Sequence, residues 1–388
     1  LLLIAGSLAP PAGAKAEVSF TILGPGPSTD ISADGSVVVG YDEESGEAWR
    51  WSAETGVVPL GNTFSLGRRR DPGSPDVSED GSWVSGTYHD LETGESAPGR
   101  WSEETGWVCF DDVQGAARGL STDASTLVGL VWEKDETAGV ALAAAWNSRD
   151  GLVTLGDPGR NSCANEANRD GTVIVGWMED PGSGTWHPTA WTPDGVQILA
   201  TTPAFCEAKS VSPDGRIIVG QAFDDIHNRR VAALWLQGDF GWVREDLGAL
   251  PGTLAGYGHA AALDLSVNGE VIVGVNRFDW NRSTGFVWTP AGGLQDVADF
   301  LGLAGVELPE GFAVEAVTAV SDDGTAFTGY GRSSGVWPAP ITSFLVETPG
   351  GVGPIVRRAT SEPAARAGQP NGLDNLPELD SRKKENPR

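Results

Sequence analysis

The chain contains the stretch Asn168-Arg-Asp-Gly-Thr-Val-Ile-Val-Gly176, and variants of this stretch recur along its whole length. Each copy has a turn led by Ser or Asn, a run of mostly β-branched residues and a closing glycine. The turn glycine stands at 35, 81, 171, 215, 269 and 324, and Ala124 takes its place in the third copy. Successive turn positions are 46, 43, 47, 44, 54 and 55 residues apart, which identifies an internal repeat with seven copies.

The second half of each copy repeats as well. A tryptophan ends a further short strand in six copies, at Trp51, Trp101, Trp146, Trp191, Trp235 and Trp288. A glycine-containing turn and a fourth apolar run follow, as in Val153-Thr-Leu-Gly156. Four short strands joined by Asp-Gly and Thr-Gly turns are typical of antiparallel hairpins, and such units build β-propeller blades. We therefore predict an all-β, seven-bladed β-propeller with four-stranded antiparallel blades.

Two segments stand outside the seven copies. Phe20-Thr-Ile-Leu-Gly24 has the ending of a fourth strand and precedes the first turn, so we expect it to complete the last blade and close the ring. The alternative is a local strand at 352–356. Between the last two copies, Leu294, Val297, Ala298 and Leu301 share the spacing of one helix face and predict a short amphipathic helix.

The ends of the chain differ in composition from the repeats. Residues 1–16 are apolar and then small, and Ala14-Lys15-Ala16 fits a signal-peptidase site, so we expect a signal peptide that is truncated at its start. The propeller then spans 17–356, and the aperiodic, Pro-rich segment 357–388 is expected to be a disordered tail. We expect a secreted or cell-surface protein, with the periplasm as an alternative.

The charge balance limits the classes of binding partner that the protein is expected to have. Lys and Arg number 26 against 53 Asp and Glu, a net charge of −27, which argues against binding nucleic acid. No other stretch reaches the length of apolar chain that a membrane helix needs, so the protein is not expected to be membrane-embedded.

The residues around the repeat tryptophans resemble the HAF extracellular repeat family, whose triplet of His, Ala and Phe precedes the tryptophan. His187-Pro-Thr-Ala-Trp191 keeps the His, Gly285-Phe-Val-Trp288 keeps the Phe and Ala48-Trp-Arg-Trp51 keeps the Ala. The resemblance covers about residues 20–347 and implies an exported bacterial repeat protein without an established activity. It carries over no catalytic residue.

Four acidic residues share one position in the repeat. Asp30, Asp76, Glu166 and Asp264 stand five residues before the turn position, on the first strand of their copies. Their following neighbours are apolar, so strand alternation turns the acids toward the central channel. They are candidate ligands for calcium, a hard cation. The alternative is that they accept hydrogen bonds from neighbouring backbone amides and tie the blades together.

Other candidate site residues lie in connecting segments. Trp186, Trp280 and Trp337 fall outside the repeat pattern, and exposed indoles there would stack on sugar rings or contact a protein partner. Cys163 and Cys206 occupy nearly equivalent places in adjacent copies, which suggests a disulfide in an exported protein. Cys109 is left over. The segments that vary most between copies are 62–75, 130–140, 177–188 and 221–230.

No residue pattern of a known catalytic type appears. The four histidines are scattered over different copies, and there is no nucleophile elbow, zinc-protease helix or phosphate loop. We therefore expect a non-enzymatic, monomeric scaffold that binds an extracellular glycan or protein, with no cofactor other than candidate calcium. One alternative is a carbohydrate-active enzyme whose carboxylates meet at the channel mouth. Another is a purely structural module of a surface assembly.

Overall fold

The computed structural model describes residues 17–61, 74–89, 96–110, 114–132, 139–333 and 339–352. The expected signal peptide and C-terminal tail both lie outside these residues. The chain divides into two compact units, Leu1–Ile355 and Val356–Arg388, and all the described residues belong to the first. No helix among them is long and apolar enough to cross a membrane.

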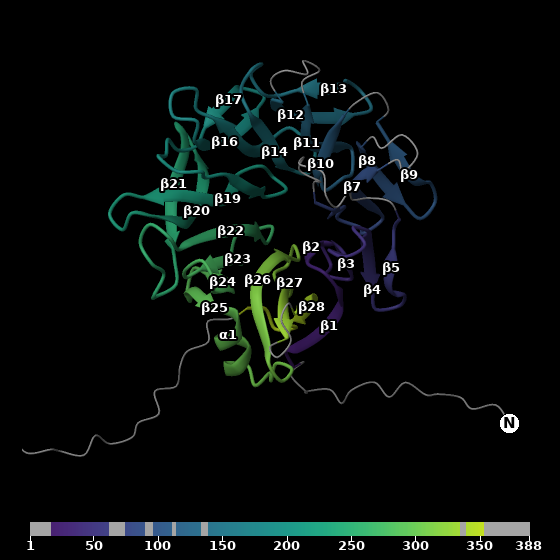
Figure 1. The fold of residues 1–388 in the computed structure, drawn as a ribbon, viewed down its shortest axis with the longest axis vertical. Coiled ribbons are helices and arrows are strands. Elements are labelled where there is room, and N and C mark those ends of the chain that lie inside the picture. The colour runs from purple at the N-terminus through teal and green to yellow at the C-terminus, as the bar shows by residue number, and fades with distance from the viewer. Residues whose placement is uncertain are drawn as a thin grey trace, which may run out of the picture. The chain divides into compact units, whose positions relative to one another are not determined.

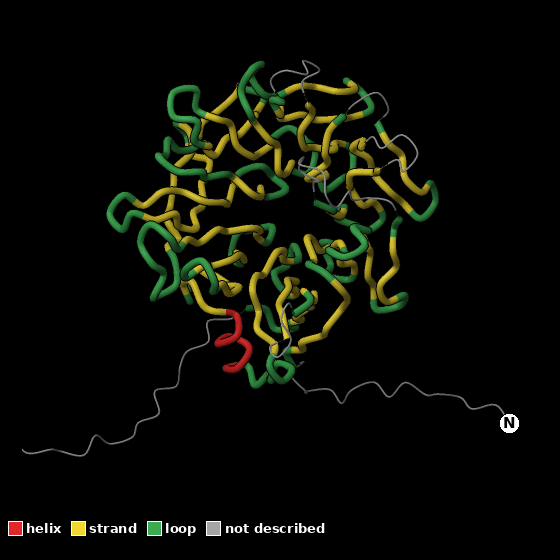
Figure 2. The backbone as a smooth tube through the Cα atoms, viewed as in Figure 1, coloured by secondary structure: helices red, strands yellow, loops and turns green. Residues whose placement is uncertain are grey.

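The first unit is built from four-stranded antiparallel sheets arranged around a common centre (Figures 1 and 2). Blades one to three consist of β2 (Ser28–Ile31), β3 (Val37–Tyr41), β4 (Ala48–Ser52) and β5 (Gly56–Pro59); β6 (Asp76–Val77), β7 (Trp83–His89), β8 (Ser96–Ser102) and β9 (Gly106–Cys109); and β10 (Gly115–Leu120), β11 (Thr126–Trp132), β12 (Ala141–Asn147) and β13 (Gly151–Thr154).

Blades four to six continue this order along the chain. They consist of β14 (Ser162–Ala167), β15 (Ile174–Glu179), β16 (Trp186–Thr192) and β17 (Gly195–Ile198); β18 (Ala208–Val211), β19 (Ile217–Asp224), β20 (Arg229–Gly238) and β21 (Gly241–Gly248); and β22 (His259–Leu265), β23 (Ile272–Arg277), β24 (Ser283–Thr289) and β25 (Gly293–Asp296). Blades five and six form one eight-stranded sheet, because Arg230 of β20 pairs with His259 of β22.

Blade seven contains both ends of the described chain. Its strands are β26 (Phe312–Val320), β27 (Ala326–Ser333), β28 (Ile341–Glu347) and β1 (Ser19–Pro25). Strand β1 pairs antiparallel with β28, with Phe20 opposite Val346, and the Phe20 ring stacks on Phe344 at 5.0 Å. The predicted β-propeller and its closure by the N-terminal strand are confirmed. Within the described residues, splitting the eight-stranded sheet at its parallel pair gives seven four-stranded units, one for each repeat.

The repeated turn owes its shape to side-chain hydrogen bonds. In blade one, Asp34 Oδ1 accepts hydrogen bonds from Ser32 Oγ and from the backbone N–H of Ser36, both at 2.9 Å. Ser32 Oγ in turn accepts the N–H of Val37 at 3.0 Å. These short polar side chains stabilise turns by satisfying backbone donors. The turn also needs a left-handed residue, and Ala124 adopts a φ of 57° where the other copies have glycine.

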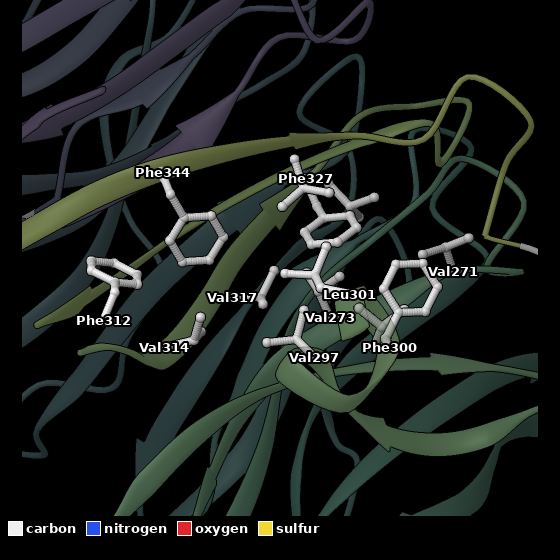
Figure 3. Close-up of a cluster of buried hydrophobic side chains, with 13 residues drawn as sticks. Val271, Val273, Val297, Phe300, Leu301, Phe312, Val314, Val317, Phe327 and Phe344 are labelled. Atoms are coloured by element: carbon white, nitrogen blue, oxygen red, sulfur yellow. The ribbon is translucent and has the colours of Figure 1, made fainter. Parts of the chain in front are cut away.

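The predicted helix forms, but it begins later than its pattern suggests. Helix α1 spans Val297–Leu303, because Asp296 caps it by accepting the N–H of Ala298 at 2.8 Å, and Leu294 belongs to β25. Ala298 is exposed rather than buried. Phe300 and Leu301 enter a cluster of buried side chains that joins α1 to blades six and seven (Figure 3).

The repeat tryptophans belong to the core between blades. Trp146, Trp191 and Trp235 are buried, and the others are partly buried against neighbouring clusters, at Trp51, Trp101 and Trp288.

The strand order gives the ring two faces. Each first strand runs from an inter-blade connection to an Asp-Gly-type turn, and the second strand runs back. The hairpin between second and third strands therefore lies on the same face as the connections. We call this the connection face, and the opposite one the turn face.

Candidate functional site

A β-bulge in the first strands brings two successive side chains to the channel. The pairing of first and second strands skips one residue in six blades, immediately before the position that the acids occupy. A bulge leaves its extra residue unpaired and redirects it. The residues skipped at this position are Thr29, Arg118, Asn165, Lys209, Leu263 and Thr318. The first strand of blade seven has a second skip farther from the turn, at Glu315.

Bulge residues and acids line the same cavity. It has a volume of about 200 Å³ and is bordered by all six skipped residues. The four predicted acids also border it, at Asp30, Asp76, Glu166 and Asp264. The repeat position thus correctly identified four side chains that meet in the channel, although they come from four different blades.

The acids of the first two blades each bind the next blade. Asp30 Oδ2 accepts the backbone N–H of Val77 in blade two at 2.8 Å. Asp76 Oδ2 accepts the N–H of Leu120 in blade three at 2.5 Å. In both cases the donor directly follows the acid position of the neighbouring blade. These hydrogen bonds are the inter-blade ties that the sequence left open as an alternative to calcium.

The acids of blades four and six, Glu166 and Asp264, also accept backbone hydrogen bonds. Asp264 Oδ2 accepts the N–H of Val320 in blade seven at 2.8 Å, and its Oδ1 accepts Ser210 Oγ of blade five at 2.9 Å. Glu166 instead accepts the N–H of its own neighbour, Ala167, at 2.8 Å. Asp264 thereby connects three consecutive blades through one carboxyl group.

Burial and mutual repulsion favour the protonated form of these acids. Burial raises the pKa values of Asp30, Asp76 and Glu166 well above the usual carboxyl range, and the charge of a neighbouring acid raises each further. Burial, followed by the charge of Asp30, raises the pKa of Asp264 to about 7. A hydrogen bond joins Asp30 to Asp76, and it raises the pKa of Asp30 while lowering that of Asp76. The net pKa of both carboxyl groups is raised, so both favour the protonated form.

Basic and amide side chains complete the cavity wall, and the sequence analysis did not identify them. Lys209 Nζ lies 2.8 Å from Glu207 Oε1, and Asn165 Nδ2 donates to Glu207 Oε2 at 3.0 Å. Burial raises the pKa of Glu207, but these two partners offset it, and the net pKa is lowered. The signal that would have found Lys209, Asn165 and Arg118 is the repeat itself, read one position before the acids.

The cavity does not have the arrangement of a metal centre. Across the described ranges, no group of three or more His, Cys, Asp or Glu side chains is placed to hold a metal ion. The carboxylate oxygens are instead engaged by backbone N–H groups and by one another. The inter-blade hydrogen bonds are present, and the calcium site stays a prediction.

The predicted disulfide is not formed. Cys163 and Cys206 are both buried, and neither belongs to a disulfide, while Cys109 is partly buried. Cys163 Sγ contacts Ala164 O at 3.5 Å within strand β14, whereas Cys206 Sγ contacts Thr202 Oγ1 at 3.5 Å in the connection before β18. The prediction was wrong because the two places are not equivalent in the structure: Cys163 lies within β14, whereas Cys206 precedes β18, and each thiol packs locally.

The three non-repeat tryptophans have different surroundings. Trp186 is partly buried: its ring stacks on Trp177 at 4.0 Å, and Phe205 packs edge-on against it at 5.1 Å. Trp280 is 78% exposed at the tip of the β23–β24 hairpin. Trp337 lies outside the described residues.

Trp280 has an aromatic neighbour that the sequence analysis missed. Tyr257, in the connection between blades five and six, is 60% exposed and packs against Trp280 with ring centroids 6.0 Å apart and an interplanar angle of 64°. The 54-residue spacing before the sixth turn was the signal for this longer connection. The two rings form an exposed aromatic corner on the connection face.

Comparison with solved structures supports the fold assignment. No protein-family model matches the chain, and a search of curated proteins finds no match. Among solved structures, a prolyl endopeptidase is 13% identical with a TM-score of 0.52, over 84% of this chain and 50% of that one. Prolyl oligopeptidase B from Galerina marginata is 10% identical with a TM-score of 0.51, over 84% and 48%.

A third similar structure is a separate domain. The β-propeller domain of Swd1 from Myceliophteria thermophila is 11% identical with a TM-score of 0.49, over 85% of this chain and 99% of that one. The chain spans about half the length of the two peptidases. At these identities the similarity concerns the fold alone.

Proposed function

We propose that this protein is a non-enzymatic scaffold that binds an extracellular glycan or protein on its connection face. The observation that carries the proposal is the corner formed by Tyr257 and Trp280, two large aromatic side chains held in contact yet mostly exposed. Tyr and Trp are enriched at binding surfaces because they combine a large apolar ring with a polar group. Export to the cell surface or beyond, and membership of the HAF repeat family, are parts of the same proposal.

The chemistry of the channel supports a structural role for its acids. Asp30, Asp76 and Asp264 each direct an oxygen to a backbone N–H of the following blade. A catalytic pair for glycoside hydrolysis needs one carboxylate free to attack or to activate water. Carboxyl groups that already accept hydrogen bonds from backbone N–H groups are poorly placed for glycoside hydrolysis, so we propose ligand binding rather than catalysis.

One observation favours a second candidate, a carbohydrate-active enzyme. Carboxyl groups from four blades border one cavity, and their pKa values are raised, Asp264 to about 7. A raised pKa is what a general acid requires near neutral pH. This candidate predicts turnover of a bound polysaccharide, which the first does not.

A glycan array separates the two candidates. The full chain is applied to a broad array of glycans and polysaccharides, in calcium and then in chelator, and the soluble fraction is analysed by mass spectrometry for released oligosaccharides. We expect retention without release, and the same retention in chelator. Released oligosaccharides would show that the protein is an enzyme instead. Glycan retention that is lost in chelator would support calcium binding by the channel acids.

A further inference from the structure

We propose that the corner formed by Tyr257 and Trp280 is a preformed site for an uncharged glycan, with a pyranose ring stacked on the exposed indole. This inference rests on the proposed function and names the ligand class and the residues that contact it. The loops that build the site are residues 224–229, 250–258 and 277–282, which we call the corner loops.

Backbone hydrogen bonds connect the three corner loops into one surface. The N–H of Gly256 donates to Asn228 O at 2.8 Å, and the N–H of Leu254 donates to Phe278 O at 3.0 Å. Within the middle loop, the N–H of Gly258 donates to Leu254 O at 2.8 Å. The loops of two blades therefore hold one another, and the backbone that carries the two rings is held in place.

A buried amide anchors the base of the middle loop. Asn276 is fully buried; its Oδ1 accepts the N–H of Leu250 at 3.0 Å, and its Nδ2 donates to Thr253 Oγ1 at 3.0 Å. Arg229 adds a hydrogen bond from Nη1 to Thr253 O at 2.9 Å. Buried polar groups that are satisfied in this way impose one conformation on a segment. The site is ordered before a ligand arrives, which lowers the entropy cost of binding.

The hairpin that carries Trp280 is fixed in the same manner. Asp279 Oδ1 accepts the N–H groups of Asn281 and Arg282 at 2.8 and 3.0 Å. The Arg282 guanidinium lies over the Phe278 ring, 4.2 Å from its centroid. Trp280 is thus presented outward from a closed turn, with carboxylate, amide and guanidinium groups beside it that are able to bond sugar hydroxyls.

The local charge indicates which ligand fits. The corner loops contain three carboxylates and three guanidinium groups, although the whole chain carries a net charge of −27. A surface that is balanced on such an acidic protein offers little attraction to a basic or an acidic partner. A neutral pyranose has an apolar C–H face and a rim of hydroxyl groups, which matches an exposed aromatic ring surrounded by balanced polar side chains.

The test uses the full chain and the uncharged glycans that bind it on an array. Affinity is measured by titration calorimetry for the parent, Trp280→Ala, Trp280→Phe and Tyr257→Ala. We expect Trp280→Ala to weaken binding about tenfold or more, Trp280→Phe to recover part of the loss, and Tyr257→Ala to weaken it several-fold. Binding of the parent should change less than about twofold between 50 and 500 mM salt, because screening acts on charges.

The control variant is Phe240→Ala, which removes a fully exposed aromatic ring from the β20–β21 hairpin tip. It should bind like the parent, and all variants should share the parent's unfolding curve. Glycan binding that Trp280→Ala leaves intact would overturn this inference while the binding scaffold stands. Binding confined to charged glycans or to proteins would also overturn it. A parent that binds no glycan and no protein would overturn the proposed function itself.

Discussion

Gly119 shows how a single residue allows two blades to approach. It occupies the acid position of blade three, and a Cβ there would lie 2.4 Å from Asn165 O and 3.0 Å from Glu166 Cα in blade four. Both atoms belong to backbone in a sheet and have little freedom to move. The glycine in this copy is therefore a requirement of the blade interface, and the missing acid follows from that packing.

Gly119→Ala should destabilise the protein by about 1–3 kcal/mol, the usual cost of forcing atoms into a filled interior. Gly302→Ala is the matched control, since no atom lies within 4 Å of its added Cβ and the residue sits in α1. That substitution should be neutral or stabilise by up to about 1 kcal/mol. Urea unfolding curves measure both effects. Equal stability of the two variants would contradict the packing argument.

Strand β1 closes the ring by pairing with β28. Phe20 is partly buried and contacts the rings of Phe312 and Phe344, with centroid distances of 5.7 and 5.0 Å. Ile22, two residues later on the same strand, is 42% exposed. The closing strand is thus held by two aromatic contacts of Phe20 as well as by its pairing with β28.

Phe20→Ala should lower the free energy of unfolding by about 3 kcal/mol, because it removes a large ring from a packed cluster. Ile22→Ala, on the same strand, should cost about 1 kcal/mol or less. Thermal and urea unfolding of the full chain check the difference. If the two substitutions cost the same, β1 does not close the ring through Phe20.

The elements also show which features the sequence predicts and which it does not. The repeat predicted the blades, the closing strand and the acids, because each depends on a fixed place in a periodic pattern. The bulge was missed because a one-residue skip in pairing leaves no mark on the alternation of Asp30 and Ile31. The disulfide prediction was wrong because similar sequence positions in two repeats placed Cys163 within β14 but Cys206 in the connection before β18. Tyr257 was missed because its contact with Trp280 joins two loops from different copies.

The buried acids affect the stability of the molecule as a whole. Their pKa values are higher in the folded state than the ordinary values, 3.8 for the three Asp residues and 4.5 for Glu166, so folding favours the protonated form. Their contribution is fully present below pH 3.8 and is lost as pH rises through the folded value, about 7 for Asp264. At about 1.4 kcal/mol per pKa unit, this carboxyl alone loses up to about 4 kcal/mol across that window.

Asp264→Asn tests this linkage, since the amide keeps an acceptor for Val320 N–H and a partner for Ser210 Oγ. We expect Asp264→Asn to be more stable than the parent at pH 8, with the advantage shrinking toward pH 4. Unfolding curves at a series of pH values give the comparison. A parallel pH profile for Asp264→Asn and parent would show that the cavity acids do not titrate as described.

Hydrogen exchange of the ligand-free full chain measures whether the corner loops form an ordered binding surface before a ligand arrives. Leu254, Gly256 and Gly258 donate backbone hydrogen bonds, so their amides should exchange at rates close to those of the neighbouring strands. Asn276→Ala should accelerate exchange in residues 250–258 selectively. If these amides in the parent exchange at once, as fast as the amide of the exposed Phe240, the corner loops are not ordered before a ligand binds.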